Sequence, residues 1–227
     1  MFTAGVIVFP GSNCDRDAAN AWQELGCGSA KLLWHRDTDL QGVDMVIVPG
    51  GFSYGDALRA GAIARFAPIM DTVAKFAQDG GLVMGICNGF QIVCEAGLLP
   101  GALARNEGLK FACKHVDLRV ETVNSPFTRA CERNATLSIP IAHGEGRYVC
   151  DEATHAQLIA DDQILFRYAN GNPNGSQDDI AGIVGGPNRN VMGMMPHPER
   201  ATRVGLGSAG GACLFRGIVA TLTEDQV

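Results

Sequence analysis

In the first half of the chain, short apolar runs alternate with stretches in which apolar residues recur at helical spacing. Continuous apolar runs that end in glycine- or proline-containing turns are typical of strands buried on both faces. We predict such strands at 4–9, 30–34, 43–48 and 82–86. The stretches between them predict helices at 15–25, 63–77 and 89–96. This repetition predicts an α/β fold with a mostly parallel central sheet and helices on both faces.

Pro68 lies inside the second predicted helix. Because proline lacks an N–H and clashes with the preceding turn, it either kinks that helix or divides it in two.

The second half of the chain has a different pattern, in which strand-like runs follow one another with few helices between them. We expect additional, antiparallel strands here, at 117–123, 137–142, 164–169, 180–184 and 191–195. Apolar residues at every fourth position predict a closing helix over 208–222. No internal repeat or linker interrupts the pattern, so we expect a single domain spanning residues 1–227.

Composition narrows the possible functions. Hydrophobic residues make up 46% of the chain and mean hydropathy is +0.07, which fits a globular protein with a sizeable core. The net charge is −6, no lysine or arginine block occurs, and only 7% of residues are aromatic. We therefore expect neither nucleic acid nor a membrane as partner. No apolar run approaches the ~20 residues of a membrane span, and no basic segment precedes the apolar start, so we expect a cytoplasmic protein.

The eight cysteines do not form a CxxC pair, and no closely spaced histidines accompany them. A zinc site is therefore poorly supported, and a disulfide framework is improbable in a chain of this length without a secretion signal. Seven of the eight are interpreted as buried thiols that act as small hydrophobes.

The exception is Cys87, in Gly85-Ile86-Cys87-Asn88-Gly89 between a predicted strand and a predicted helix. This pattern has the form of a nucleophile elbow, whose glycines let a strained turn pass between strand and helix. The helix N-terminus favours a thiolate, and the N–H of Asn88 would point toward a developing oxyanion. The alternative is an ordinary strand–turn–helix with a buried cysteine.

A thiolate nucleophile needs a base, and the base needs an orienting acceptor. His197-Pro198-Glu199 follows the last predicted strand, and residues two apart face the same way in an extended segment. Glu199 would then reach the imidazole of His197. Pro49-Gly50-Gly51 also follows a buried strand, and the backbone N–H at Gly51 would complete an oxyanion hole with that of Asn88. Taken singly, the loop histidine and the glycine turn have ordinary structural explanations. All three motifs follow predicted strands, however, and one parallel sheet would bring those strand ends together.

The Cys87 elbow continues into Phe90-Gln91, and with His197-Pro198-Glu199 near the C-terminus it resembles the class I, or triad, glutamine amidotransferases. Longer strings resemble one branch of that family, the glutaminase subunits of phosphoribosylformylglycinamidine synthase. They are 11–15, 49–56, 59–64, 143–147, 170–176 and 194–200.

The resemblance implies a flavodoxin-like fold and hydrolysis of glutamine through a Cys87 thioester, with His197 and Glu199 completing the triad. It implies that Gln91, His143 and Gly144 lie in the region that holds the α-amino and carboxylate groups of glutamine. No metal or other cofactor is expected on this chain, which has no phosphate-binding Gly-Lys loop. ATP and Mg²⁺ are expected on a separate synthetase subunit, with a small third subunit bridging the complex.

Two other interpretations remain at this point. A cysteine peptidase or esterase on the same scaffold would act without a partner and would not require the His-Pro-Glu adjacency. A non-catalytic binding subunit would keep the fold but would not need the intact set of Cys87, His197 and Glu199.

Overall fold

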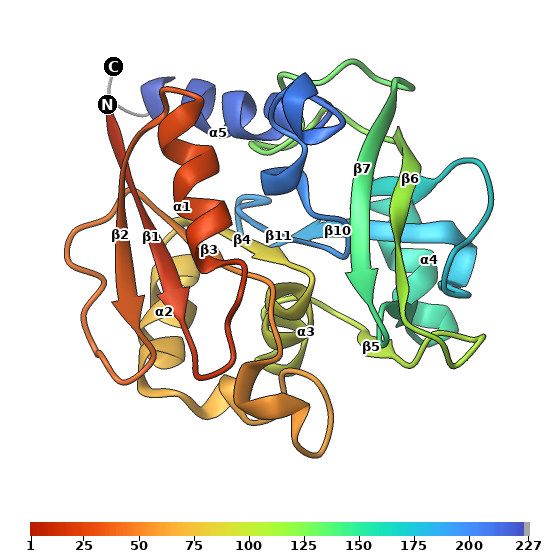
Figure 1. Ribbon diagram of the computed structural model, residues 1–227, viewed down its shortest axis with the longest axis horizontal. Helices are drawn as coiled ribbons and strands as arrows, with labels where there is room; N and C mark the ends of the chain where they lie inside the picture. The colour runs from red at the N-terminus through yellow and green to blue at the C-terminus, as the bar shows by residue number, and fades with distance from the viewer. Residues whose placement is uncertain (225–227) are drawn as a thin grey trace.

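A computed structural model describes residues 1–224 of the 227-residue chain, and its centre is one nine-stranded sheet (Figure 1). The spatial order of the strands is β2-β1-β3-β4-β11-β10-β9-β6-β7. Their bounds are β1 Phe2–Val8, β2 Gly28–Trp34, β3 Met45–Val48, β4 Leu82–Ile86, β6 Ala112–Val120, β7 Thr136–His143, β9 Ile164–Tyr168, β10 Ile180–Gly185 and β11 Val191–Met194.

The sheet is parallel in one part and antiparallel in the other. The pairs from β2 through β1, β3 and β4 to β11 are parallel. The pairs from β11 through β10, β9 and β6 to β7 are antiparallel. The predicted division of the sheet, with antiparallel strands added by the second half of the chain, is therefore confirmed.

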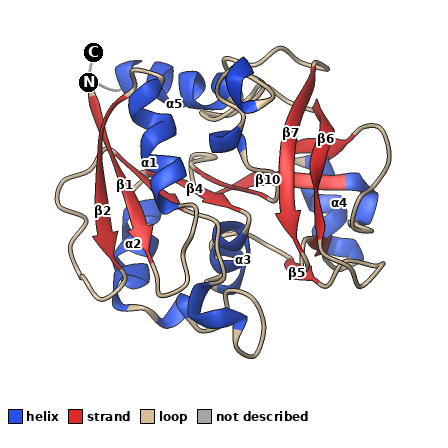
Figure 2. Ribbon diagram, in the orientation of Figure 1, coloured by secondary structure: helices blue, strands red, loops and turns tan. Residues whose placement is uncertain are grey.

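Within residues 1–224, five α-helices flank this sheet (Figure 2). They are α1 Asp15–Glu24, α2 Pro68–Gln78, α3 Asn88–Glu95, α4 Glu152–Ala160 and α5 Ala212–Glu224. Figure 1 shows α1 and α5 on one side of the parallel strands and α2 and α3 on the other. In these described residues, no helix combines the length and apolar character needed to cross a membrane.

Pro68 divides the second predicted helix rather than kinking it. A short 3₁₀ helix spans Ala64–Phe66, and Pro68 then occupies the first turn of α2, where its missing N–H costs nothing. The closing helix begins at Ala212 instead of residue 208, because Ser208 bridges to Arg203 and the N–H of Gly211 donates to the carbonyl of Ala201.

The sequence pattern did not reveal α4 or a second sheet, made of β5 (Ala102–Ala104) and β8 (Arg147–Val149). Only Leu158 of α4 is buried, so this helix carries almost no apolar periodicity. The two strands are too short to show an alternation.

The interpretation of seven cysteines as buried thiols was only partly right. Cys14, Cys27 and Cys94 are buried, but Cys113 is exposed and Cys150 is half-buried. Cys131 and Cys213 are disulfide-bonded, with 5.2 Å between their Cα atoms. The bond joins residues 82 apart in sequence, a proximity that only the folded chain creates.

Candidate active site

The three motifs singled out from the sequence follow three adjacent parallel strands. Gly51 follows β3, Cys87 follows β4, and His197 follows β11. Val48 pairs with Gly85, and Met194 pairs with Ile86, so the three strands end at the same level of the sheet. Carboxyl ends of parallel strands are where α/β proteins place their ligands. The sheet therefore gathers these motifs at one edge, as predicted.

Cys87 occupies a strained elbow between β4 and α3. Its φ is +52° and its ψ is −107°, in a region that non-glycine residues rarely adopt. A Cβ at Gly89 would lie 1.8 Å from the carbonyl oxygen of Val48, and one at Gly85 would lie 2.8 Å from that of Gly89. Both glycines are thus required by close packing around the turn, which holds the Cys87 side chain at the N-terminus of α3.

His197 and Glu199 form a buried pair. The Nδ1 atom of His197 lies 2.6 Å from Oε1 of Glu199, and both residues are almost fully buried. Burial disfavours a charge on His197, but the Glu199 carboxylate and the sulfurs of Cys87 and Cys14 outweigh it and raise the pKa of His197 well above its ordinary value. The site therefore favours an imidazolium beside the Cys87 sulfur.

The backbone conformation that brings Glu199 to His197 differs from the predicted extended segment. His197 and Glu199 do not share an extended segment, because Pro198–Arg200 forms a 3₁₀ turn. His197 lies just before that turn, and its backbone N–H donates to the carbonyl of Pro140 in β7. The turn brings the Glu199 side chain back to the His197 ring. Proline at the start of the turn supplies the required φ.

Gly51 and Asn88 both adjoin Cys87, since Gly51 lines the same cavities and Asn88 follows Cys87 in the chain. Asn88 begins α3, so its N–H is among those without an acceptor inside the helix. Gly51 has φ +154° and bridges to Ser12, and a Cβ there would lie 2.8 Å from the carbonyl oxygen of Gly11. The backbone at Gly51 therefore lies beside the cavity that Cys87 lines, and its part in an oxyanion hole stays a prediction.

A cavity of about 200 Å³ opens in front of Cys87. Predicted residues from three separate segments line it: Gly51, Cys87, Gln91, His143 and Gly144. Phe52, Asp56, Phe111, Ala142 and Glu145 complete the lining. The structure thus brings the predicted nucleophile and the predicted substrate-contact residues to one cavity.

Gln91 is buried and fixed by its neighbours rather than exposed on a helix surface. Its amide nitrogen donates to the carbonyl of Glu145 at 2.5 Å, and its oxygen accepts from the Asn88 side chain at 2.8 Å. Gln91 therefore ties α3 to the 143–147 segment across the cavity.

His143 is also buried, at the end of β7, and its Nδ1 lies 3.1 Å from Oδ1 of Asn106. Because that oxygen also accepts from the backbone N–H of Gly146, His143 must be the donor. Burial and the charge of His197 lower the pKa of His143 to about 4, so it is neutral near pH 7.

Sequence reasoning missed Asp56, which faces the same cavity. Burial and the nearby Glu145 carboxylate raise its pKa to about 6. The Asn88 amide approaches Asp56 Oδ1 at 3.4 Å, and the backbone N–H of Ala60 approaches Glu145 Oε2 at 3.4 Å. Asp56 ends the Pro49–Asp56 string, which was the only available signal.

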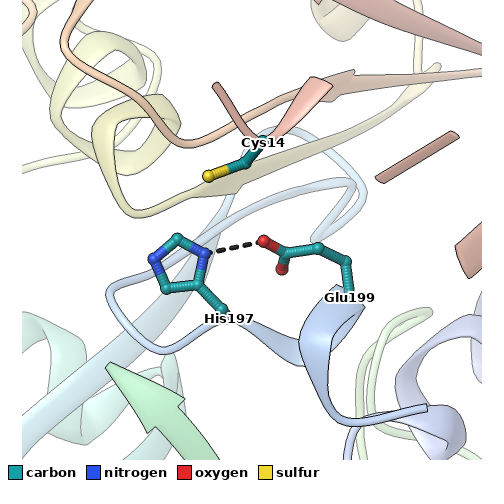
Figure 3. Close-up of side chains that lie close together, drawn as sticks. All are labelled: Cys14, His197 and Glu199. Atoms are coloured by element: carbon teal, nitrogen blue, oxygen red, sulfur yellow. Dashed lines mark hydrogen bonds and ion pairs between the residues drawn. The ribbon is translucent and has the colours of Figure 1, made fainter. Parts of the chain in front are cut away.

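Cys14 also belongs to this region, although the sequence indicated only a buried thiol. It follows β1, the strand beside β3, and it is 2% exposed. Figure 3 shows its sulfur above the ring of His197 and near Glu199. Ligand-type atoms of these three residues lie within 4.8 Å of one another, and Nη2 of Arg200 donates to the sulfur at 3.1 Å.

Comparison with known proteins identifies the family. Residues 2–208 match the family described as CobB/CobQ-like glutamine amidotransferase domain. The chain is 53% identical over 228 residues to the phosphoribosylformylglycinamidine synthase subunit PurQ of Koribacter versatilis, covering 97% of this chain and 98% of that one. It is 56% identical over 215 residues to the PurQ subunit of a Nostoc species, covering 95% and 96%. This chain belongs to the CobB/CobQ-like glutamine amidotransferases.

Solved structures support the same placement of this glutamine amidotransferase. A chain in the structure of PurLQS from Thermotoga maritima superposes with a TM-score of 0.88 at 44% identity, covering 98% of this chain and 100% of that one. A putative GMP synthase subunit from Thermoplasma acidophilum shares the fold, with a TM-score of 0.65 at 16% identity and coverage of 100% and 96%. The flavodoxin-like amidotransferase fold expected from the sequence is confirmed.

Proposed function

We propose that this chain is the glutaminase subunit of phosphoribosylformylglycinamidine synthase, in purine biosynthesis, and that Cys87, His197 and Glu199 hydrolyse glutamine. One observation carries the chemical part of this proposal. A cysteine on a strained elbow stands beside an imidazole whose other nitrogen is held by a buried carboxylate. This is the arrangement that nucleophilic cysteine catalysis requires.

In the first step, the Cys87 thiolate attacks the side-chain amide carbon of glutamine. The oxygen gains negative charge and is stabilised by the backbone N–H groups of Gly51 and Asn88. His197 then donates a proton to the amide nitrogen, the C–N bond breaks, and ammonia leaves. The γ-glutamyl group remains on Cys87 as a thioester. In the second step, His197 takes a proton from water, whose oxygen attacks the thioester, and glutamate and the thiol are released.

The cavity also supports recognition of the amino-acid end of glutamine. The carboxylates of Asp56 and Glu145 face it and match an α-ammonium group. Gln91, His143 and Gly144 line the same cavity and, in this proposal, shape the pocket around the α-carbon.

The ammonia is consumed elsewhere. The PurQ names of the relatives and the PurLQS structure support a complex with an ATP-dependent synthetase of PurL type and a small bridging subunit of PurS type. In that complex, ATP and Mg²⁺ act on the synthetase, which converts formylglycinamide ribonucleotide to the amidine. The proposal keeps the cytoplasmic location expected from the sequence.

The test is a Cys87→Ala variant assayed in the assembled complex. We expect glutamine-dependent synthesis to fall to background, because no thioester can form, while synthesis from added ammonia keeps its parent rate. Product is measured for both nitrogen sources under the same conditions. Loss of both activities would show that Cys87 is needed for assembly or folding and would remove the proposed role.

A further inference from the structure

The side chain of Asn88 lies at the centre of a hydrogen-bond network that reaches the glutamine cavity. Asn88 directly follows Cys87 and is 2% exposed, and the chemistry proposed above uses only its backbone N–H. Its Oδ1 accepts from the backbone N–H of Ser53 at 3.0 Å. Its Nδ2 donates to Oε1 of Gln91 at 2.8 Å and to Oδ1 of Asp56 at 3.4 Å. Because both ends of the amide are engaged, the side chain is held in one orientation.

Backbone groups fix which end of each amide in this network is the nitrogen. The N–H of Ser53 can only donate, so the Asn88 atom that faces it is the oxygen. The carbonyl of Glu145 can only accept, so the nitrogen of Gln91 faces it at 2.5 Å and the oxygen of Gln91 is turned to Asn88. Asn88 therefore presents its nitrogen to both Gln91 and Asp56. Because an amide nitrogen only donates, the Asp56 oxygen in this contact is an acceptor.

The Asn88 contact acts on Asp56 in the opposite direction to the rest of its surroundings. Burial and the Glu145 carboxylate oppose a charge on Asp56 and raise its pKa to about 6. An amide N–H binds a carboxylate more strongly than a neutral carboxylic acid, so the contact with Asn88 favours the ionised form. Three other titratable or charged side chains belong to these surroundings, namely Cys87 and His143 in the cavity lining and Arg105, which lies 3.5 Å from Glu145.

We propose that the side chain of Asn88 is a positioning group for glutamine, which holds Asp56 as an ionised acceptor for the α-ammonium group. This inference rests on the proposed function, in which Asp56 faces that end of the substrate. The backbone N–H of Asn88 adjoins Cys87, where the amide carbon reacts, and its side chain reaches Asp56 and Gln91 in the cavity lining. One residue thus connects the two ends of the substrate, and it favours glutamine over an amide that lacks the α-amino group.

The first test follows the KM for glutamine across pH in the assembled complex. Asn88→Asp keeps the acceptor for Ser53 but replaces the donor to Asp56 by a second carboxylate. Because two adjacent carboxylates resist ionising together, we expect the fall in KM with rising pH to move up by at least about one pH unit. Asn88→Ala removes the donor without adding a charge, so the shift should have the same sign and be smaller. Asn188→Asp, at an exposed position before β11, should leave the profile unchanged.

The second test measures binding without turnover, by calorimetry on the assembled complex that carries Cys87→Ala. The two ligands are glutamine and glutaramate, which is glutamine without its α-amino group and so cannot pair with Asp56. Adding Asn88→Ala should weaken glutamine at least about fivefold and glutaramate less than about twofold, because only glutamine uses the Asp56 carboxylate.

The role of Asn88 is overturned if both ligands weaken equally, or if Asn88→Asp leaves the pH dependence of KM where it is in the parent. Either result would show that the side chain of Asn88 only supports the local structure. A Cys87→Ala complex that binds no glutamine at any pH would instead remove the proposed function, and with it the substrate that Asn88 is proposed to position.

Discussion

Glu199 contributes most to the raised pKa of His197, through a contact of 2.6 Å between buried atoms. Replacing it by glutamine keeps the shape but removes the charge that raises the pKa of His197. We expect Glu199→Gln to lower glutamine-dependent kcat by about 10²- to 10⁴-fold, as in other triads that lose the orienting carboxylate. Because His197 then loses its proton at lower pH, the alkaline limb of the pH profile should move to lower pH. Steady-state rates measured across pH check both effects. If the alkaline limb of the Glu199→Gln profile stays where it is in the parent, Glu199 does not raise the pKa of His197.

The raised pKa of Asp56 predicts a pH dependence on the acid side, in KM. Burial and Glu145 raise its pKa to about 6, so it is protonated below that pH and ionised above it. If its carboxylate binds the α-ammonium of glutamine, KM should fall as pH rises from about 5 to about 7 and then level off. Asp56→Asn should give a high KM without that dependence. An Asn variant whose KM still falls over this range would exclude Asp56 as the titrating group.

At the residue scale, the sequence singled out the candidate site residues that lie in motifs. Cys87, His197 and Glu199 were predicted because a nucleophile elbow and a His-Pro-Glu string have recognisable neighbours, and the structure brings all three together. Asp56 and Cys14 were not found, because their roles arise from loops that meet only after β1, β3 and β4 have assembled.

At the scale of elements, the passage from β4 to α3 depends on close packing against β3. A Cβ at Gly89 would lie 1.8 Å from the Val48 carbonyl oxygen, and backbone cannot move aside as a side chain can. We expect Gly89→Ala to reduce the free energy of unfolding by more than about 2 kcal/mol. Gly205→Ala, where nothing lies within 4 Å of the added carbon, should change it by less than about 1 kcal/mol. Urea denaturation of both variants checks this, and equal effects would contradict the packing argument.

Strands and helices with a clear pattern of apolar residues were predictable from the sequence, and those without such a pattern were not. The buried runs that became β3 and β4 fell within the predicted ranges, since an uninterrupted apolar run has few other stable outcomes in a chain of this size. The helix α4 was missed because it buries only Leu158 and is held by an Asp151 cap and its surroundings. Tertiary contacts, not local pattern, determine such segments.

At the scale of the whole molecule, exposed apolar side chains stand near the mouth of the glutamine cavity. Phe52 and Phe111 line the cavity and remain 45% and 54% exposed, and Leu109, which is 78% exposed, lies just before Phe111 in the chain. Large apolar side chains gathered at one exposed place mark an interaction surface. In the proposed mechanism ammonia leaves beside Cys87, so we expect a synthetase that receives it without loss to water to cover this opening.

This reasoning predicts that a charge placed on the exposed segment that leads into Phe111 weakens the complex. We expect Leu109→Asp to raise the dissociation constant for the synthetase and bridging subunits at least about tenfold, because a buried, unpaired carboxylate is costly at an interface. Ile159→Asp is the matched control, since Ile159 is 53% exposed but lies on α4, outside the cavity lining. Binding is measured by calorimetry or analytical ultracentrifugation, with far-ultraviolet circular dichroism to establish that both variants fold. If the two variants bind alike, the synthetase does not cover this opening, and ammonia must leave the glutaminase cavity by another route.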